Sequence, residues 1–264
     1  MTDVDDQIAG GDGYRLRSVG AWLPPLLALA GLVALTVGRA DRAAFIAVNH
    51  LGPATSDTLW ANITILGDAV VAAALCLPLW RRRPDLLWAL VMSALVATAW
   101  VHLLKPVVNA PRPLAILGEA VHVIGGSYRW RSFPSGHATT LFLVAGLVIL
   151  GIRSRAVATL ASALALAGAL SRSVVGAHWP SDLLGGLIGG WLSAACGLAV
   201  ARRSLAFGTR AVVQGVIGAL LAACALALLF GYRTGYPQAL AFQRVLGAAC
   251  LASAVLTYRW RSRG

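Results

Sequence analysis

The chain has 264 residues, of which 58% are hydrophobic and only 12% are charged. Soluble globular domains carry about 25% charged residues, so this composition indicates an all-α integral membrane protein. The formal net charge of +12 does not predict nucleic-acid binding, because the arginines form short clusters between apolar runs, as topology signals do. The four cysteines lie inside apolar runs without CxxC spacing, which favours free thiols over disulfides or a zinc site.

The N-terminal residues 1–19 contain four aspartates and three glycines, so we expect a disordered cytoplasmic tail. A secretory signal is not expected, because a basic n-region is missing and the first apolar run is too long. A membrane-spanning helix needs about 20 mostly apolar residues. Windows of that length predict eight helices, at 21–38, 59–80, 86–104, 137–152, 156–171, 182–201, 211–231 and 243–258.

The basic residues predict the orientation of these helices. Most of the 22 fall on one side of the predicted membrane, and they include Arg81, Arg82, Arg83, Arg202 and Arg203. By the positive-inside rule, we expect both termini in the cytoplasm and the opposite helix ends at the outer face of a bacterial plasma membrane.

Aromatic and small residues indicate how the helices are anchored and packed. Tryptophans and tyrosines near helix ends are expected at the membrane interface, among them Tyr128, Trp130, Trp179, Tyr232 and Tyr236. The sixth predicted helix carries Gly185-Gly186 and Gly189-Gly190, a small-xxx-small spacing that allows close helix packing. A nucleotide-binding glycine loop is a poor alternative, because no strand precedes these glycines.

The stretch from Ser171 to Asp182 contains the strongest signal for chemistry. His178 and Asp182 are four residues apart, so on a helical turn they share a face. The carboxylate can then hold one imidazole nitrogen and leave the other free as a nucleophile. Arg172 offers a planar fork that suits phosphate oxygens. A capped helix start with a salt bridge is the simpler alternative for this stretch.

A second polar cluster follows the third predicted helix. Lys105 is the only lysine in the chain, and Arg112 lies seven residues further on. This spacing would align the two cations on one helical face, although Pro106 and Pro111 favour an irregular turn. The two cations suit a multiply charged oxyanion. The alternative is that both side chains extend to lipid headgroups.

A third cluster, Ser135-Gly136-His137, marks the start of the fourth predicted helix. A helix N-terminus presents free amides and a positive dipole to an anion. Gly136 lets the backbone approach a phosphate closely, and the Ser135 hydroxyl adds a donor. His137 would stand beside the bound group, although a histidine here also fits a helix cap.

Together the three clusters supply two histidines, an orienting carboxylate, three cations and an anion-binding helix start. This set predicts phosphoryl transfer through a covalent phosphohistidine. We expect no metal and no cofactor. The cations neutralise charge, and the other acids on this face do not form a cluster of the kind magnesium uses; they are Asp41, Asp57, Asp68 and Glu119.

The patterns K-x6-R-P, P-S-G-H and S-R-x5-H-x3-D resemble the three signature motifs of the type 2 phosphatidic acid phosphatase superfamily, in the family's order and with its spacing. The resemblance covers roughly residues 20–204 and implies a six-helix catalytic core there. It implies His178 as the nucleophile, Asp182 as its orienting group and His137 as the general acid. The phosphate would be bound by Lys105, Arg112, Ser135, Gly136 and Arg172.

Residues 205–264 extend beyond that core, with two additional transmembrane helices and a short basic tail. These helices contain no acid and no histidine, so we expect a packing or substrate-groove role. Residues 114–133 join the first two motifs and should lie over the site at the membrane surface.

The predicted function is hydrolysis of a lipid phosphate or diphosphate at the outer face. The candidate substrates are polyprenyl diphosphates such as undecaprenyl diphosphate, phosphatidate, phosphatidylglycerol phosphate and lipid A phosphates. A polyprenyl diphosphate or a glycerolipid phosphate is favoured. A lipid-to-lipid phosphotransferase would use the same intermediate. A transporter or scramblase of anionic lipids would use the charges for transport. The expected partners are the bilayer and the lipid substrate, and no nucleic acid is expected. The sequence does not predict the oligomeric state.

Overall fold

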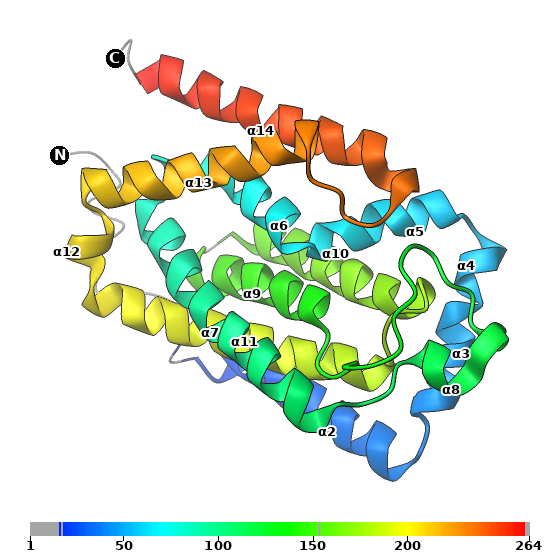
Figure 1. Ribbon diagram of the computed structural model, residues 1–264. Helices are drawn as coiled ribbons and strands as arrows, with labels where there is room; N and C mark the ends of the chain where they lie inside the picture. The colour runs from blue at the N-terminus through cyan, green and yellow to red at the C-terminus, as the bar shows by residue number, and fades with distance from the viewer. Residues whose placement is uncertain (1–15, 17, 153, 262–264) are drawn as a thin grey trace.

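The computed structural model describes residues 16, 18–152 and 154–261, and this part of the chain folds into helices and connecting segments without any strand (Figure 1). The predicted all-α fold is confirmed. Most of the predicted N-terminal tail, residues 1–15 and 17, lies outside the described residues.

Each of the eight predicted helices has a counterpart in the structure. They are α2 (Leu23–Val37), the pair α5 (Asp57–Thr64) and α6 (Ala69–Cys76), α7 (Pro84–Val108), α9 (Gly136–Gly151), α10 (Arg155–Val174), α11 (Pro180–Arg203), α13 (Ala211–Phe230) and α14 (Leu240–Arg261). The hydropathy windows missed four short helices, α3 (Asp41–Asn49), α4 (Leu51–Ala54), α8 (Pro113–Leu117) and α12 (Leu205–Gly208). The described residues also form five short 3-10 helices: η2 (Val19–Ala21), η3 (Ile65–Gly67), η4 (Leu77–Leu79), η5 (Gly118–Ala120) and η6 (Pro237–Ala239).

Not every predicted helix is a straight membrane span. Within the described residues, five helical segments are long and apolar enough to cross a membrane: Pro84–Ala120, Arg155–Val174, Pro180–Arg203, Ala211–Phe230 and Pro237–Leu256. Two further candidates are bent pairs, Leu23–Val37 with Asp41–Ala54 (105°) and Asp57–Gly67 with Ala69–Leu79 (69°). The helix α9 is apolar but only 16 residues long.

The break between α5 and α6 has a local cause. The Asp68 carboxylate accepts hydrogen bonds from the backbone N–H of Val70 (2.9 Å) and Val71 (3.3 Å). An aspartate in this N-cap position starts a new helix, so α6 takes a new direction. The hydropathy window, which averages over both halves, does not register such a cap.

The central helix of the bundle is α11, which packs against α9, α7 and α2. Its glycines allow the close approach. A side chain at Gly186 would meet Ala138 of α9, one at Gly190 would meet Thr139, and one at Gly189 would meet Trp100 of α7. The predicted packing role of these glycines is confirmed.

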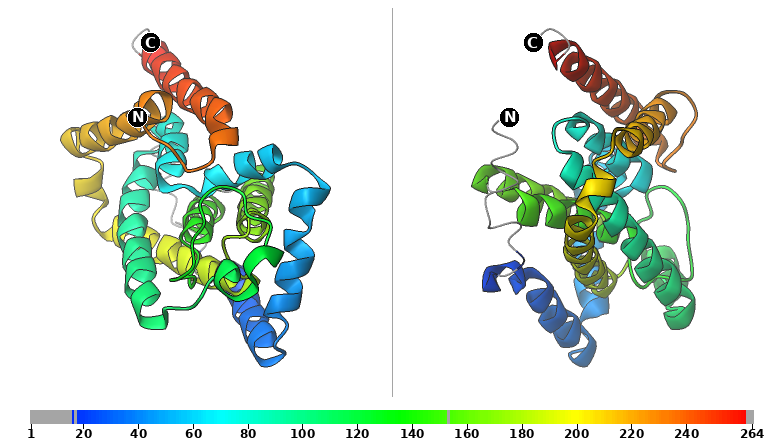
Figure 2. Two further views of the ribbon diagram at one scale, coloured as in Figure 1. Left: turned by 45° about the vertical axis from the view of Figure 1, so that its right-hand side comes forward. Right: turned by 90° about the vertical axis from the view of Figure 1, so that its left-hand side faces the viewer.

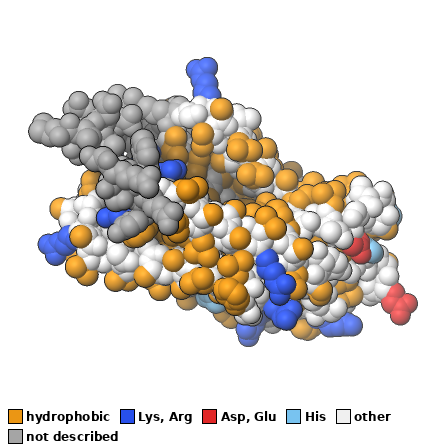
Figure 3. All heavy atoms as spheres, turned by 90° about the horizontal axis from the view of Figure 1, so that it is seen from above, with side chains coloured by type: hydrophobic (Ala, Val, Ile, Leu, Met, Phe, Trp, Pro, Cys, Tyr) orange, Lys and Arg blue, Asp and Glu red, His pale blue; other side chains and the backbone are white. Residues whose placement is uncertain are grey.

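The two C-terminal helices, α13 and α14, form a layer on one side of the bundle. They pack against each other and against α6, and α2 lies on the opposite side (Figure 2). Hydrophobic side chains spread over much of the face seen in Figure 3, with separate groups of Lys and Arg side chains among them and at its edges. Such a distribution is typical of a surface that faces lipid.

The three motif clusters lie at one end of the bundle. The helices α9, α10 and α11 are joined by short connections and reverse direction each time. The start of α9, the end of α10 and the start of α11 therefore meet, together with the end of α7. The long connection from α7 to α9 crosses this end and carries α8 (Figure 1).

Candidate active site

The start of α11 positions His178 and Asp182. Trp179 is the N-cap residue, Pro180 the first helical residue and Asp182 the third. The Asp182 Oδ2 atom accepts a hydrogen bond from the Trp179 backbone N–H (2.9 Å) and lies 3.1 Å from His178 Nδ1. The Ser132 hydroxyl donates a short hydrogen bond to the same oxygen. Asp182 thus caps the start of α11 and also holds His178. From the sequence, a helix cap and a histidine–carboxylate pair were alternatives, and the structure contains both.

The environment of His178 favours a neutral imidazole. The residue is only 2% exposed. Burial lowers the pKa of His178 well below its usual value of 6.5, and the positive charges of Arg112, Arg172 and Lys105 lower it further. An ionised carboxylate can only accept a hydrogen bond, so Nδ1 carries the proton. The Nε2 atom then has a free lone pair and can act as a nucleophile.

The predicted cations Lys105 and Arg112 are fixed by backbone carbonyl groups. Lys105 Nζ donates to the Arg131 carbonyl (2.8 Å), and Arg112 Nε donates to the Trp130 carbonyl (3.0 Å). Arg112 Nη1 donates to the carbonyl of Ala177 (3.0 Å), the residue before His178. At 9% exposure, Arg112 is buried beside the histidine and does not extend to the lipid headgroups.

The sequence predicted that the seven-residue spacing would align Lys105 and Arg112 on one helical face. The structure shows instead the irregular turn that Pro106 and Pro111 favoured. Pro106 is accommodated in the last turn of α7, and the helix ends at Val108. Asn109 follows with a left-handed φ of 42°, which turns the chain away from the helix axis. The Arg112 backbone N–H then donates to the Arg129 carbonyl (2.9 Å), so the loop holds it.

The start of α9 is hydrogen-bonded to the backbone of Asp182. Ser135 is its N-cap, with its hydroxyl 3.4 Å from the Ala138 N–H, and the Ser135 N–H donates to the Asp182 carbonyl (3.1 Å). A side chain at Gly136 would make an ordinary contact with Val101, 3.8 Å away. The Nε2 atom of His137 is buried and has no hydrogen-bond partner among the described residues. Because buried polar atoms normally have a partner, this nitrogen is available to a ligand.

The third cation, Arg172, ends α10 and is 4% exposed. Its Nη1 atom donates to the Thr64 hydroxyl (2.7 Å) and to the Tyr236 hydroxyl (2.6 Å). Its Nε is buried and unpaired within the described part of the chain. In that same part, neither Arg172 nor Arg112 forms an ion pair with a carboxylate. The three cations thus exceed the single carboxylate of Asp182 in this cluster, and such an excess of positive charge favours an anion.

The structure adds residues that sequence reasoning missed. Ser132 is fully buried. Only its position two residues before the P-S-G-H motif could have indicated in the sequence that it belongs to the site. Thr64 and Tyr236 contact Arg172 from distant segments, and no sequence pattern marks them. The prediction of Tyr236 as an interfacial anchor was wrong, because its side chain is only 7% exposed; Tyr128 (59%) and Trp130 (60%) are exposed as expected.

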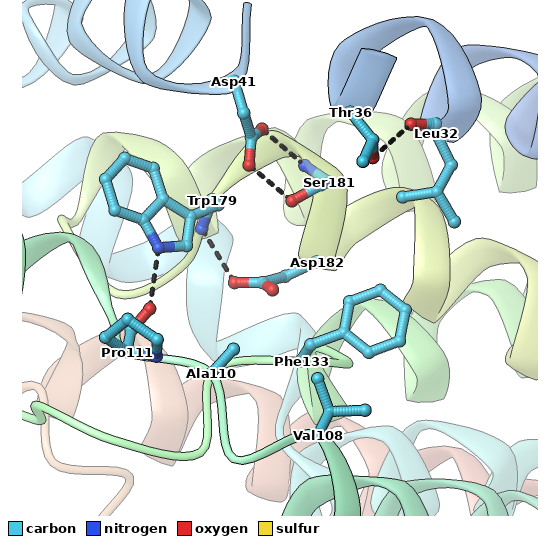
Figure 4. A pocket seen from close by; sticks show the side chains of 10 residues that line it. All are labelled: Leu32, Thr36, Asp41, Val108, Ala110, Pro111, Phe133, Trp179, Ser181 and Asp182. Carbon is cyan, nitrogen blue, oxygen red and sulfur yellow. Dashed lines mark hydrogen bonds between the residues drawn. The ribbon is translucent and has the colours of Figure 1, made fainter. Parts of the chain in front are cut away.

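A cavity of about 480 Å³ reaches Asp182 and Trp179 from the side of α2 and α3 (Figure 4). Its remaining lining is mostly apolar: Leu32, Thr36, Asp41, Val108, Ala110, Pro111, Phe133 and Ser181. On its wall the Asp41 carboxylate accepts hydrogen bonds from the Ser181 N–H (2.9 Å) and hydroxyl (2.5 Å). This pair ties α3 to the first turn of α11, next to Asp182.

Other histidine, cysteine and acidic side chains in the described part of the chain lie outside this cluster or do not form a metal site. His122, in the connection from α7 to α9, pairs with Asp57 (2.8 Å) outside the cluster of cations. No three His, Cys, Asp or Glu side chains of the described residues lie close enough together to hold a metal ion. All four cysteines are free thiols, as their positions predicted.

Fold and site together describe a helical membrane protein in which two histidines and three cations meet at one end of the bundle. Comparison with known proteins specifies this class further. Residues 86–205 match the PAP2 superfamily, and this segment contains all eight predicted site residues. The resemblance seen in the motifs is thereby confirmed, and the chain carries a PAP2 region.

Curated relatives and a solved structure agree with this result. The chain is 43% identical over 84 residues to a lipid A 1-phosphatase of Rhizobium etli and 36% identical over 132 residues to one of Rhizobium johnstonii. These matches cover 31% and 46% of this chain and 35% and 49% of the relatives' length, so the chain spans at most about half of them. The crystal structure of Aquifex aeolicus LpxE is similar with a TM-score of 0.55 and 27% identity, over 60% of this chain and 94% of that one.

Proposed function

We propose that this chain is a membrane phosphatase that removes a phosphate group from a lipid through a phosphohistidine intermediate. The observation that carries the proposal is the His178–Asp182 pair, a neutral buried imidazole held at Nδ1 and surrounded by three cations. The PAP2 region and the lipid A 1-phosphatase relatives support the same activity.

The first step forms the intermediate. Nε2 of His178 attacks the phosphorus atom, a P–N bond forms, and the P–O bond to the lipid breaks. His137 donates a proton to the departing oxygen. Lys105, Arg112 and Arg172, with the Ser135 hydroxyl and the Gly136 amide, bind the phosphoryl oxygens and stabilise the developing charge.

The second step releases phosphate. His137, now deprotonated, accepts a proton from a water molecule, whose oxygen attacks the phosphorus atom. The P–N bond breaks, inorganic phosphate leaves, and His178 is neutral again. Since three cations neutralise the phosphoryl group, we propose that the reaction needs no metal and no cofactor.

An amphiphilic substrate fits the surroundings of this site. The mostly apolar cavity reaches Asp182, so hydrophobic parts of a lipid could lie beside a phosphate bound at His178. Among the candidate substrates, the names of the relatives favour lipid A 1-phosphate over the polyprenyl diphosphates and glycerolipid phosphates that sequence reasoning favoured.

We also propose the arrangement in the membrane. The basic residues Arg81, Arg155 and Arg202 lie at the ends of α7, α10 and α11 opposite the site, which supports a cytoplasmic location for those ends. The site then faces outward from a bacterial plasma membrane. We propose residues 20–204 as the catalytic core, with two additional transmembrane helices and a short basic tail in residues 205–264.

The experiment that tests this proposal measures phosphate release by the purified protein in detergent. The substrates are lipid A 1-phosphate, undecaprenyl diphosphate, phosphatidate, phosphatidylglycerol phosphate and a soluble sugar phosphate, all with EDTA present. We expect release from a lipid and loss of at least about a thousandfold in His178→Ala, as for removal of other nucleophiles.

The alternatives give different results in the same experiment. Transfer of labelled phosphate to a second lipid, without free phosphate, would identify a phosphotransferase. Lipid binding without any turnover, in a folded protein, would favour a transporter. Activity that appears only when magnesium replaces EDTA would contradict the metal-free mechanism.

A further inference from the structure

The connection between α13 and α14 contributes a side chain to the site although it lies outside the PAP2 region at residues 86–205. The Tyr236 hydroxyl is 2.6 Å from Arg172 Nη1, which also donates to Thr64. The Tyr236 ring centroid lies 5.9 Å from the guanidinium carbon. The C-terminal extension thus contacts a proposed phosphate-binding residue directly.

Packing contacts and hydrogen bonds hold the connection between α13 and α14 in place. Tyr236 packs against Gly125, where any side chain would clash with the tyrosine ring. The Gln243 amide donates to the carbonyl groups of Leu228 (3.0 Å) and Tyr232 (2.8 Å). Gly235 supplies the left-handed turn, with a φ of 86°. The position of the Tyr236 hydroxyl is therefore defined by its surroundings.

The hydrogen bonds of Arg172 explain what this hydroxyl does. A guanidinium has five N–H donors in a fixed plane. Nη1 has two of them, and the structure provides two hydroxyl acceptors, Thr64 and Tyr236, from different segments. Two acceptors at one nitrogen fix the plane of the group. They leave its Nε buried and unpaired within the described residues, available to a phosphoryl oxygen.

We propose that Tyr236 is a positioning residue, which holds the Arg172 guanidinium so that its free donors meet the phosphoryl group. This inference rests on the proposed function. It assigns the C-terminal helix pair a part in substrate binding, whereas the sequence predicted only a packing or groove role.

The test uses the full-length Tyr236→Phe variant, which keeps the ring and its packing and removes only the hydroxyl. Loss of one hydrogen bond to a charged group should lower kcat/KM by at least about tenfold. The inhibition constant of inorganic vanadate, which occupies the phosphoryl site without a lipid tail, should rise by a similar factor. A purely structural role would lower the melting temperature and leave vanadate inhibition unchanged.

The matched control is Tyr232→Phe, which removes a hydroxyl from the same connection, bonded to Asp68 and not to Arg172. We expect it to keep the wild-type inhibition constant of vanadate. Wild-type kinetics in Tyr236→Phe, or equal effects of the two variants on vanadate, would overturn the positioning role alone. A wild-type protein that neither hydrolyses a lipid phosphate nor binds vanadate would overturn the proposed function and this inference with it.

Discussion

At the scale of single residues, the site is organised by one carboxylate oxygen. Asp182 Oδ2 receives hydrogen bonds from Ser132 and Trp179 and faces His178 Nδ1. The spacing of His178 and Asp182 predicted their pairing on a helical turn. The pairing is found, but His178 precedes the N-cap Trp179 and meets Asp182 across the start of α11. Ser132 and Tyr236 were not predictable in the same way, since they reach the site across 50 and 64 residues of chain and only the tertiary fold brings them there.

The lowered pKa of His178 leads to a prediction about pH dependence. Burial and the neighbouring cations disfavour the protonated imidazole, so the folded protein takes up this proton at a lower pH than an exposed histidine, whose pKa is about 6.5. The acidic limb of kcat/KM, which reports the free enzyme, should therefore lie below pH 6.5. An acidic limb of kcat/KM with its inflection at pH 7 or above would contradict a neutral nucleophile.

At the scale of elements, hydropathy windows located the long helices but not their breaks or the short helices. The window at 59–80 spans α5 and α6, which Asp68 separates by capping the second helix. The hydropathy windows did not predict the short α3, yet its Asp41 accepts two hydrogen bonds from Ser181 at the start of α11. Caps and single hydrogen bonds of this kind depend on partners that a 20-residue average does not contain.

The glycine face of α11 predicts the outcome of a matched pair of substitutions. Gly186→Ala would place a methyl group against Ala138 and the Ser135 carbonyl and push α9 away from Asp182. Overpacking of this kind costs about 1–3 kcal/mol, so we expect a lower melting temperature and reduced activity. Gly215→Ala in α13 meets open space and should be neutral or slightly stabilising. Differential scanning fluorimetry and phosphate release measure both effects, and equal melting temperatures for the two variants would refute the packing role.

At the scale of the whole molecule, the alternation of α9, α10 and α11 gathers the three motifs at one end, and most of the basic helix ends lie opposite. Composition predicted the membrane location and the all-α fold, because few charged residues leave no other environment for so much apolar surface. The number of spans was less predictable, since α2 and α9 have only 15 and 16 residues. At 1.5 Å per residue, such helices fall short of a bilayer core of about 30 Å.

The proposed orientation predicts the behaviour of a reporter fused after Arg261. With both ends of the chain in the cytoplasm, a green fluorescent protein fusion should fluoresce, and an alkaline phosphatase fusion should be inactive. A reporter inserted in the exposed turn at Gly118 should give the opposite result. Alkaline phosphatase activity after Arg261 would contradict the cytoplasmic C-terminus, and a fluorescent fusion at Gly118 would contradict the outward-facing site that we propose.

The contact between Tyr236 and Arg172 has a consequence for biosynthesis. Ribosomes make Arg172 first, and Tyr236 follows only 64 residues later, after α13 has been synthesised. Until then the buried guanidinium lacks one of its two hydroxyl acceptors. A nascent chain that has inserted only the PAP2 region would therefore hold an imperfectly organised site, and the proposed site would be complete only when the last helix pair has entered the membrane.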